Sequence, residues 1–517
     1  MPLRAAEVLE LQLDGLAIPI DLHQLKTWSQ APERNRSDLA MWLNLLDERS
    51  RRNLMQLLEA PLLRDRSFGR QLLSSWTGEQ LLNELGQLLR LDDGRSEHNG
   101  ATLLRQTVNG LLERQNDINS LDLLLALPSQ RVSLKLDGVF ELAQQWHDQL
   151  ERQRLAWQRL NQLKLPQRQA SPLELNLFSH GDRGLSQALA VSHRREPLPL
   201  ELWPSRSSKP RAWVLLMPGL GGSGGQLSWL AAALARWGWP VVVVDHPGSD
   251  EAAMKASLEG QRPPPGAESL QERLGDVEAV LAAQRRGDLA QLGVPPGTPV
   301  VLMGHSLGGL IALMAAGQTP EPALEARCRA ALSRLPLTNL SRLLQCQLPG
   351  RARRLPQDTP IAAVVAFNSF GSLLWPRQGL ARLEAPVLLV GGSLDLITPP
   401  LDEQLGVFAG QRHARSRLVL IDGGSHFSPV RVNSEQQAVF RLGDDLVGVD
   451  PLKVQALLLQ LTHEFLQGLD EPLLLSPQTR TYKGVRAHVL DSPLARRWQQ
   501  QLRNRGVDRA EPPTRRP

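Results

Sequence analysis

The sequence predicts an α/β fold, a mostly parallel β-sheet with helices on both faces, preceded by a mainly helical N-terminal domain. Two observations support this prediction. From residue 173 onward, short apolar runs alternate with helix-forming segments, the pattern of a parallel sheet with crossover helices. Over residues 37–163, apolar residues instead recur at steps of three and four, the spacing of amphipathic helices. A chain of 517 residues also exceeds the usual size of one hydrophobic core, so two domains are expected.

The N-terminal domain is expected over residues 1–165. Weak alternation over residues 7–22 indicates a small hairpin with its turn near Asp14-Gly15, and a long helix is expected after Asp137-Gly138. Two apolar stripes at helical spacing follow the hairpin: Leu72, Leu73, Trp76, Leu81, Leu82, Leu85, Leu88 and Leu89, and then Phe140, Leu142, Trp146, Leu150, Leu155, Trp157 and Leu160. Packing of a helical core explains these stripes most simply, and a lid or a lipid-docking surface is the alternative. Residues 166–172, with a proline at each end, are the expected linker.

The second domain is expected over residues 170–480. Its buried strands are predicted at 212–217, 241–245, 300–303, 361–367, 386–390 and 417–421, and its helices at 269–286, 310–316 and 451–467. Residues 319–360 interrupt this alternation and are expected to form an insert that caps the active site. Two roles are open for Leu340, Leu343 and Leu344 in the insert. They either form an apolar wall against an acyl chain or pack within the cap. Residues 484–517 are expected to be a basic, disordered tail.

Residues 300–309, with the sequence VVLMGHSLGG, carry the strongest functional signal in the chain. An apolar strand ends in a GxSxG turn and passes into a helix, which is the setting of a nucleophilic serine. The turn is so tight that the positions two before and two after Ser306 must be small, and they hold Gly304 and Gly308. Ser306 is therefore expected at strained backbone angles, with its hydroxyl above the sheet.

A serine hydroxyl needs a base to become a nucleophile, and the base needs an orienting acid. Asp395 and His426 follow Ser306 in this order, each on the loop after a predicted strand, so all three are expected at one edge of the sheet. Taken singly, Asp395 could be a turn residue and His426 a surface histidine. Their order and placement favour a Ser306–His426–Asp395 triad. The rival acid position, after the strand at 361–367, holds Asn368-Ser369 instead.

Two backbone amides are expected to stabilise the negative charge of an acyl-transfer intermediate. One is the amide of Leu307, directly after the serine, and the other is that of Leu220 in the glycine-rich loop 218–225. A nucleotide site is the competing interpretation of this loop, but neither a Gly-Lys-Ser/Thr ending nor a GxGxxG pattern is present. His246, after the strand at 241–245, either lines the pocket or packs in the structure.

Five segments carry a resemblance to known enzymes: Pro218–Gly222, Val243–Ser249, Gly304–Gly309, Asn339–Cys346 and Gly423–Ser428. They resemble cyanobacterial α/β-hydrolases with an N-terminal helical domain of unknown function and, more distantly, platelet-activating-factor acetylhydrolases and dienelactone-hydrolase-like enzymes. The resemblance implies the α/β-hydrolase fold with a cap insert, and a serine esterase or lipase acting on acyl esters. It matches Ser306, Asp395 and His426 to the triad and Leu220 and Leu307 to the oxyanion donors.

Two positions depart from the pattern of these relatives. The oxyanion loop often begins with His-Gly, whereas this chain has Pro218-Gly219. Dienelactone hydrolases use a cysteine nucleophile, whereas position 306 is a serine, which argues against that chemistry.

Composition limits the classes of partner. The net charge is +5, and arginine is spread through the chain rather than clustered before the tail, so no nucleic-acid partner is expected. No stretch approaches about 18 consecutive apolar residues, so no transmembrane segment is expected, while peripheral membrane contact stays open. The first residues lack the apolar core of a signal peptide. The chain as written is expected in the cytoplasm, or in the periplasm or medium if a signal peptide has been removed or missed.

The two cysteines, Cys328 and Cys346, are too few for a disulfide scaffold or a zinc cluster. In an oxidising compartment they could pair, which would close a loop of about 18 residues and stabilise the fold by about 3 kcal/mol. Two reduced, buried thiols are the default expectation. No metal and no organic cofactor is expected.

These residues together predict a serine hydrolase that cleaves carboxylic esters through an acyl-enzyme, with small-molecule esters or lipid acyl esters as candidate substrates. An acyltransferase or thioesterase would use the same triad with a different acceptor or donor. A non-catalytic binding protein on the same fold is the other alternative, although such proteins usually lose a member of the triad.

Overall fold

The computed structural model describes residues 5–32, 34–63, 66–92, 100–170, 184–205, 210–266, 268–333, 336, 338–348, 358–431, 448–469 and 475–504. The chain forms two compact units. The first comprises residues 1–147 with 253–264 and 332–337, and the second comprises residues 148–252, 265–331 and 338–517. The domain limits near residues 165 and 170 stay predictions.

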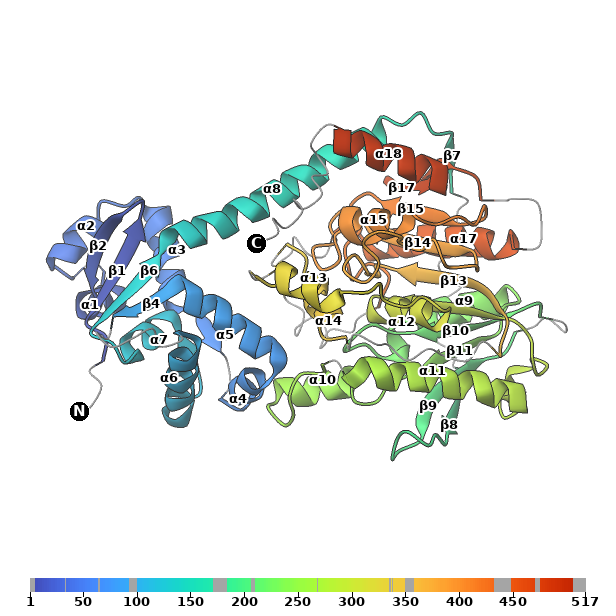
Figure 1. Ribbon diagram of the computed structural model, residues 1–517, viewed down its shortest axis with the longest axis horizontal. Helices are drawn as coiled ribbons and strands as arrows, with labels where there is room; N and C mark the ends of the chain where they lie inside the picture. The colour runs from blue at the N-terminus through green and yellow to red at the C-terminus, as the bar shows by residue number, and fades with distance from the viewer. Residues whose placement is uncertain are drawn as a thin grey trace. The chain divides into compact units, whose positions relative to one another are not determined.

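A four-stranded sheet lies among the helices of the first unit (Figure 1). Strands β1 (Val8–Leu13) and β2 (Leu16–Asp21) form the expected hairpin around Asp14 and Gly15. Strand β1 also pairs in parallel with β6 (Arg131–Lys135), and β6 pairs antiparallel with β4 (Leu89–Asp92). The prediction of a mainly helical domain therefore missed a sheet, because its strands are brief and find their partners far along the chain.

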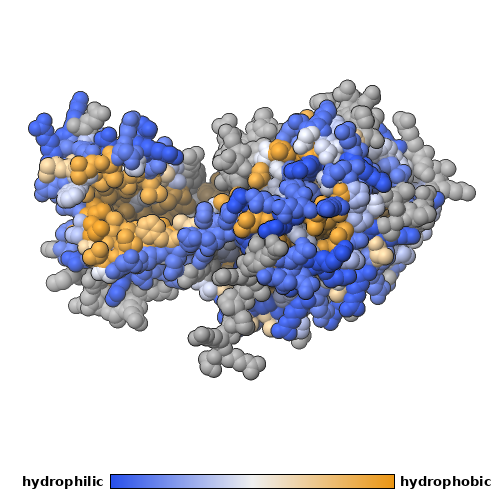
Figure 2. Space-filling model, turned by 90° about the horizontal axis from the view of Figure 1, so that it is seen from above, coloured by the Kyte–Doolittle hydropathy of each residue, from blue (hydrophilic) through white to orange (hydrophobic). Residues whose placement is uncertain are grey.

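Helices supply most of the remaining described residues of the first unit. They are α1 (Leu22–Gln30), α2 (Asp38–Leu43), α3 (Glu48–Glu59), α4 (Arg66–Ser74), α5 (Trp76–Leu88), α6 (Gly100–Arg114) and α7 (Ser120–Ala126), and β3 (Pro61–Leu63) pairs with β5 (Ile118–Asn119). Leu73 and Leu82 of the first predicted stripe are buried in the core of this unit. Apolar side chains also gather on its surface, as Figure 2 shows; Trp42 and Leu45, for example, are 72% and 77% exposed.

The long helix α8 (Leu136–Asn161) begins in the first unit and ends in the second. The apolar residues of its last turns, Trp157 and Leu160, are buried in the core of the second unit. Phe140, Trp146 and Leu150 are exposed. The prediction that the second apolar stripe packs in a core is thus right for Trp157 and Leu160 and wrong for Phe140, Trp146 and Leu150.

An eleven-stranded sheet, in the order β7-β16-β17-β15-β14-β13-β12-β10-β11-β9-β8, forms the centre of the second unit (Figure 1). Its strands are β7 (Gln167–Gln169), β8 (Leu185–Leu189), β9 (Leu198–Trp203), β10 (Trp213–Met217), β11 (Val241–Val244), β12 (Val300–His305), β13 (Ile361–Phe367), β14 (Val387–Gly392), β15 (Arg417–Ile421), β16 (Gln478–Tyr482) and β17 (Val485–Leu490). Six consecutive strands of the sheet, β11-β10-β12-β13-β14-β15, are parallel to one another, as expected for near-continuous apolar runs.

Helices cover both faces of this sheet. Apolar residues of α11 (Glu268–Arg286), α12 (Leu307–Ala315) and α18 (Ser492–Asn504) pack on one face, and those of α9 (Ser228–Arg236) and α17 (Pro451–Gln467) pack on the other. The remaining helical segments of the second unit are η2 (Gly224–Gln226), η3 (Ala290–Leu292), α13 (Leu324–Ala331), α14 (Ser341–Cys346), η4 (Leu401–Leu405) and α15 (Gly406–Phe408). Most of α10 (Glu251–Leu258) belongs to the first unit. The expected doubly covered, mostly parallel sheet is confirmed.

The predicted tail at residues 484–517 is wrong as far as residue 504. Strand β17 pairs antiparallel with both β15 and β16, and α18 follows it. Ala495, Trp498 and Leu502 of α18 recur at steps of three and four and are buried, so its arginines occupy the solvent side of an amphipathic helix. Residues 505–517 lie outside the described part of the chain.

The predicted linker also contributes to the sheet, because β7 pairs in parallel with β16. In the insert at 319–360, the described residues form α13 and α14, joined by a disulfide between Cys328 and Cys346. The structure therefore has a disulfide in place of the two reduced thiols expected by default. Residues 349–357 of the insert lie outside the described part.

Candidate active site

Ser306 lies at the turn between β12 and α12, with φ 51° and ψ −117°. The glycines on either side are required by packing. A Cβ on Gly304 would lie 2.3 Å from the carbonyl carbon of Gly308, and a Cβ on Gly308 would lie 2.3 Å from the carbonyl oxygen of Met217. The serine has the strained backbone angles expected from the sequence, and they project it from the end of a buried strand.

Three side chains from three loops form a continuous chain of hydrogen bonds. His426 Nε2 lies 3.0 Å from Ser306 Oγ, and His426 Nδ1 lies 2.9 Å from Asp395 Oδ2. Asp395 lies beyond the end of β14, and His426 lies beyond the end of β15, so the parallel strands bring all three residues to the carboxyl edge of the sheet. Asp395 is fully buried, and Ser306 and His426 are 7% and 6% exposed. This geometry suits transfer of the serine proton to the histidine.

The carboxylate of Asp395 is held on both oxygens. Oδ1 accepts hydrogen bonds from the amides of Ile397 (3.0 Å) and Thr398 (2.7 Å). Oδ2 accepts from Asn368 Nδ2 (2.7 Å) and Thr398 Oγ1 (2.5 Å), besides facing His426. Burial by itself would raise the pKa of Asp395, but the charge of His426 and the hydrogen bonds from His426 and Thr398 lower it below the ordinary value. The group is therefore ionised at neutral pH and oriented for one partner.

Two residues of the site lacked a signal in the sequence. Asn368 occupies the rival acid position and there supports Asp395 instead of replacing it. His305, before the serine, lies 2.8 Å through Nε2 from the carbonyl oxygen of His426. Burial, together with the charge of His426, lowers the pKa of His305 to about 3, so the ring is neutral and donates its Nε2–H to that carbonyl. The GxSxG pattern leaves this position variable and gave no hint of its contact.

The glycine-rich loop borders a small pocket at Ser306. Its volume is about 30 Å³, and its lining comprises residues 219–222 together with Gln226, His305, Ser306, His426, Phe427 and Val430. Within the described part of the chain, the amides of Leu220 and Leu307 make no hydrogen bond. The amide of Leu307 is one of the unpaired donors at the start of α12. Both amides are therefore free to bind an oxygen atom.

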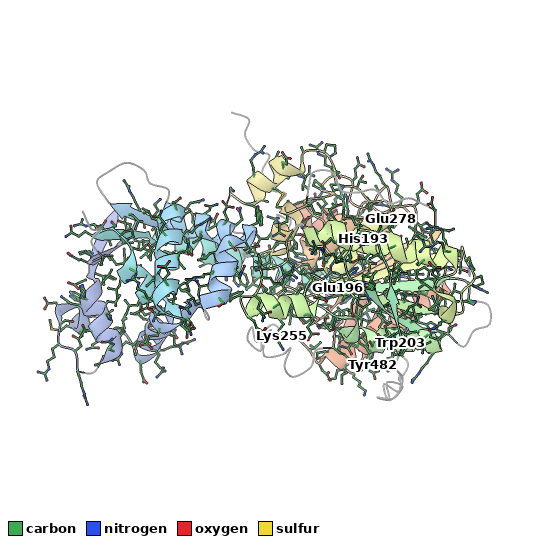
Figure 3. The ribbon with its side chains drawn as sticks, turned by 90° about the horizontal axis from the view of Figure 1, so that it is seen from below. His193, Glu196, Trp203, Lys255, Glu278 and Tyr482 are labelled. Atoms are coloured by element: carbon green, nitrogen blue, oxygen red, sulfur yellow. A yellow bond between two sulfur atoms is a disulfide. The ribbon has the colours of Figure 1, made fainter. Side chains whose placement is uncertain are left out.

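His246 packs in the structure instead of lining this pocket. It is fully buried, and its Nδ1 lies 2.8 Å from Asp276 Oδ2. Asp276 also accepts hydrogen bonds from Arg194 and lies 2.7 Å from His193 Nε2. Figure 3 shows His193 in the second unit. Burial, with a contribution from the charge of Arg273, lowers the pKa of His246 to about 4.

Over the ranges that the structure describes, no group of three or more His, Cys, Asp or Glu side chains is arranged to hold a metal ion. The same ranges contain no helix long and apolar enough to cross a membrane.

Two family models match the chain in different parts. Residues 5–135 match one described as an alpha/beta hydrolase of unknown function (DUF1400), and residues 208–360 match one described as serine aminopeptidase, S33. With the sheet described above, these matches show that the chain has the α/β-hydrolase fold. The narrower resemblance to cyanobacterial enzymes and to platelet-activating-factor acetylhydrolases stays a prediction.

Curated relatives are similar to part of the second unit. The pimeloyl-[acyl-carrier protein] methyl ester esterase of Neisseria meningitidis serogroup A / serotype 4A is 28% identical over 224 residues, which cover 36% of this chain and 62% of that protein. The enzyme of the same name from serogroup C / serotype 2a is 27% identical over 224 residues, covering 36% of this chain and 76% of its own length. The chain thus spans less than two thirds of the first of these relatives. Both relatives are named as esterases.

Proposed function

We propose that this α/β hydrolase cleaves carboxylic esters with Ser306 as the nucleophile, His426 as the general base and Asp395 as the orienting acid. The observation that carries the proposal is the unbroken chain of hydrogen bonds from Ser306 Oγ through His426 to Asp395. The neighbouring pocket and the two unpaired amides support it, because acyl transfer needs a nucleophile and an oxyanion site side by side.

The reaction would proceed in two steps. Ser306 Oγ attacks the ester carbonyl and its proton passes to His426 Nε2, while Asp395 holds the imidazolium through Nδ1. The carbonyl oxygen becomes an oxyanion that accepts hydrogen bonds from the amides of Leu220 and Leu307. Collapse of the intermediate expels the alcohol, which takes the proton from His426, and leaves an acyl-enzyme. Water activated by His426 then releases the acid and restores the serine.

The ester class is supported by the relatives, which are named as esterases. Small-molecule esters and lipid acyl esters are the two substrate classes to be tested. An acyltransferase or a thioesterase would use the same residues, and adding alcohol acceptors or thioester donors to the assay separates these outcomes. A non-catalytic binding protein is disfavoured by the intact hydrogen-bond chain.

The test is labelling with a fluorophosphonate probe, combined with hydrolysis of p-nitrophenyl acetate, butyrate and palmitate. We expect the wild-type protein to be labelled and Ser306→Ala to be unlabelled, with turnover lower by about five to six orders of magnitude. Ser492→Ala removes the hydroxyl of another buried serine, outside the pocket, and is the matched control that should keep full labelling. A wild-type protein that folds but neither reacts with the probe nor hydrolyses any ester would overturn the proposal.

A further inference from the structure

Arg273 of α11 is a fully buried cation whose guanidinium binds the loops behind the candidate active site. Nη1 donates to the carbonyl of Pro218 at 2.8 Å, and Nη2 donates to the carbonyls of Gly219 (3.0 Å) and Ser249 (2.9 Å). Nε donates to Ser249 Oγ at 2.8 Å. All of these acceptors are neutral, and three of the four are backbone carbonyls. A charged side chain is thus placed where it fixes the backbone of the oxyanion loop.

The carbonyl of Gly219 determines where the next amide points, and it accepts hydrogen bonds from Arg273 Nη2 (3.0 Å) and from the amide of Gly222 (3.2 Å). The peptide between Gly219 and Leu220 is trans, so its C=O and N–H groups point in opposite directions. Because the carbonyl faces Arg273, the N–H of Leu220 faces away from Arg273. Gly219 packs closely on the nucleophile elbow, since a Cβ there would be 3.0 Å from His305 Nδ1 and 3.3 Å from Ser306 Cβ. Leu220 itself lines the pocket at Ser306.

The loop is also held just beyond Leu220. The amide of Gly221 donates to the carbonyl of Ser249 at 2.9 Å, and this same carbonyl accepts from Arg273 Nη2. The residues on both sides of Leu220 are therefore anchored to Arg273, directly at Gly219 and through Ser249 at Gly221. The Leu220 peptide cannot rotate without breaking one of these bonds.

Charge supports this arrangement. Burial lowers the pKa of Arg273 to about 9, while the carboxylates of Asp276, Asp250 and Asp245 oppose that shift, so the guanidinium remains cationic at neutral pH. A cation on the carbonyl side of a peptide also polarises it and makes its N–H a stronger donor. Arg273 is thus suited both to orient the amide of Leu220 and to strengthen it.

We propose that Arg273 is a positioning residue for oxyanion stabilisation, which it exerts by fixing the Gly219–Leu220 peptide so that its N–H faces the substrate carbonyl. This proposal rests on the proposed ester hydrolysis, and it assigns to α11 a role in the chemistry although Arg273 does not touch the substrate.

The kinetic test compares an ester with its thionoester, in which sulfur replaces the carbonyl oxygen and accepts hydrogen bonds poorly. A variant that has lost an oxyanion donor loses more activity on the ester than on the thionoester, whereas general damage lowers both equally. We expect Arg273→Met to lower kcat/KM for the ester by about 100- to 1,000-fold, and the ester-to-thionoester ratio by at least about tenfold. Ser249→Ala removes one acceptor and is a milder second variant, with a smaller change in the same direction.

Arg417→Met is the matched control. Arg417 is also buried and donates to the carbonyls of Leu475, Ala414 and Ser416, but it lies at the start of β15, the end of the strand remote from the site. We expect this variant to leave the ester-to-thionoester ratio unchanged. An unchanged ratio in Arg273→Met, or an equal fall in Arg417→Met, would overturn the proposal.

Hydrogen exchange provides a readout that needs no turnover. In wild-type protein the Gly221 amide is bonded to Ser249, and we expect its exchange to accelerate at least about tenfold in Arg273→Met and to change little in Arg417→Met. If exchange accelerates but no ester is cleaved even by the wild-type protein, the anchor is real and the proposed function fails. If exchange of the Gly221 amide is unchanged, Arg273 does not hold the loop, whatever the activity. Should Arg273→Met fail to fold, the same measurements on Ser249→Ala decide the matter.

Discussion

Asn368 donates its side-chain amide to Asp395 Oδ2 at 2.7 Å, the same oxygen atom that faces His426 Nδ1. The oxygen that faces the histidine is therefore also held by a second donor. Since φ of Asn368 is 48°, its backbone occupies the left-handed region, which asparagine tolerates better than most residues. The conformation turns the chain at the end of β13 and brings the amide onto Asp395.

We expect Asn368→Ala to reduce kcat by about tenfold, since a hydrogen bond to a charged group contributes about 1.5–3 kcal/mol and its loss loosens Asp395. Probe labelling should remain, but more slowly. Asn339→Ala is the control, because Asn339 also donates from its side chain to a buried carboxylate, that of Glu403, outside the triad. An equal loss of kcat in both variants would mean that the effect is structural.

Asp395→Asn should lower kcat by about four orders of magnitude with little change in KM. The amide can no longer accept the Nδ1–H of His426 as a carboxylate does, so the ring loses its orientation and its charge partner. Steady-state kinetics on p-nitrophenyl acetate measures the effect. Activity within tenfold of wild type would remove Asp395 from the proposed triad.

The stability of the fold should depend on pH through His246. Its pKa is about 4 in the folded protein against an ordinary value of 6.5, so between these values the unfolded chain binds a proton that the folded chain does not. The free energy of unfolding therefore falls as the pH is lowered from 6.5 to 4, by up to about 1.4 kcal/mol per pH unit for this one group. His305 shifts in the same direction.

Urea denaturation of wild type and His246→Asn at several pH values checks this expectation. The variant should be less stable at pH 8, because it alters the contact with Asp276, yet lose less stability between pH 7 and pH 4.5. Parallel stability curves for the two proteins would show that His246 does not titrate as its burial implies.

Reduction of the Cys328–Cys346 disulfide should lower stability by about 3 kcal/mol, since the bond closes a loop across a sequence separation of 18. Thiol counting in denaturant should find two thiols only after reductant is added. The Cys328→Ser/Cys346→Ser variant should match the reduced protein and should not respond to reductant. Two free thiols in the untreated protein would contradict the bond.

Trp498→Ala should destabilise the second unit by about 3–5 kcal/mol, because this side chain of α18 is 1% exposed within the core. Its exposed neighbour Arg497 is the control, and Arg497→Ala should change stability by less than about 0.5 kcal/mol. Equal, small effects in both would favour the disordered tail that the composition suggested.

The sequence could predict those features of the fold and of the candidate site that depend on residues close together in the chain. Ser306, Asp395 and His426 each follow an apolar strand. Because these strands are parallel, prediction of the strands was enough to place the three residues at the same edge of the sheet. The sheet of the first unit escaped because β1 and β6 pair across more than a hundred residues, which periodicity within a window cannot reveal. The contacts of Arg273 could not be predicted for a similar reason. It is one arginine in a helix, and it donates mainly to backbone carbonyls, which every residue type has.

Strand β7 and the end of α8 affect how this protein can be divided. A shortened chain that started at residue 170, where the sequence suggests a boundary, would lack β7, the short edge strand that covers β16, so the longer strand β16 would become the edge of the sheet. It would also lack Trp157, which packs in the core and donates from Nε1 to Asp422 at 2.6 Å. Such a fragment would tend to aggregate, and expression of the second unit by itself should begin no later than the second half of α8.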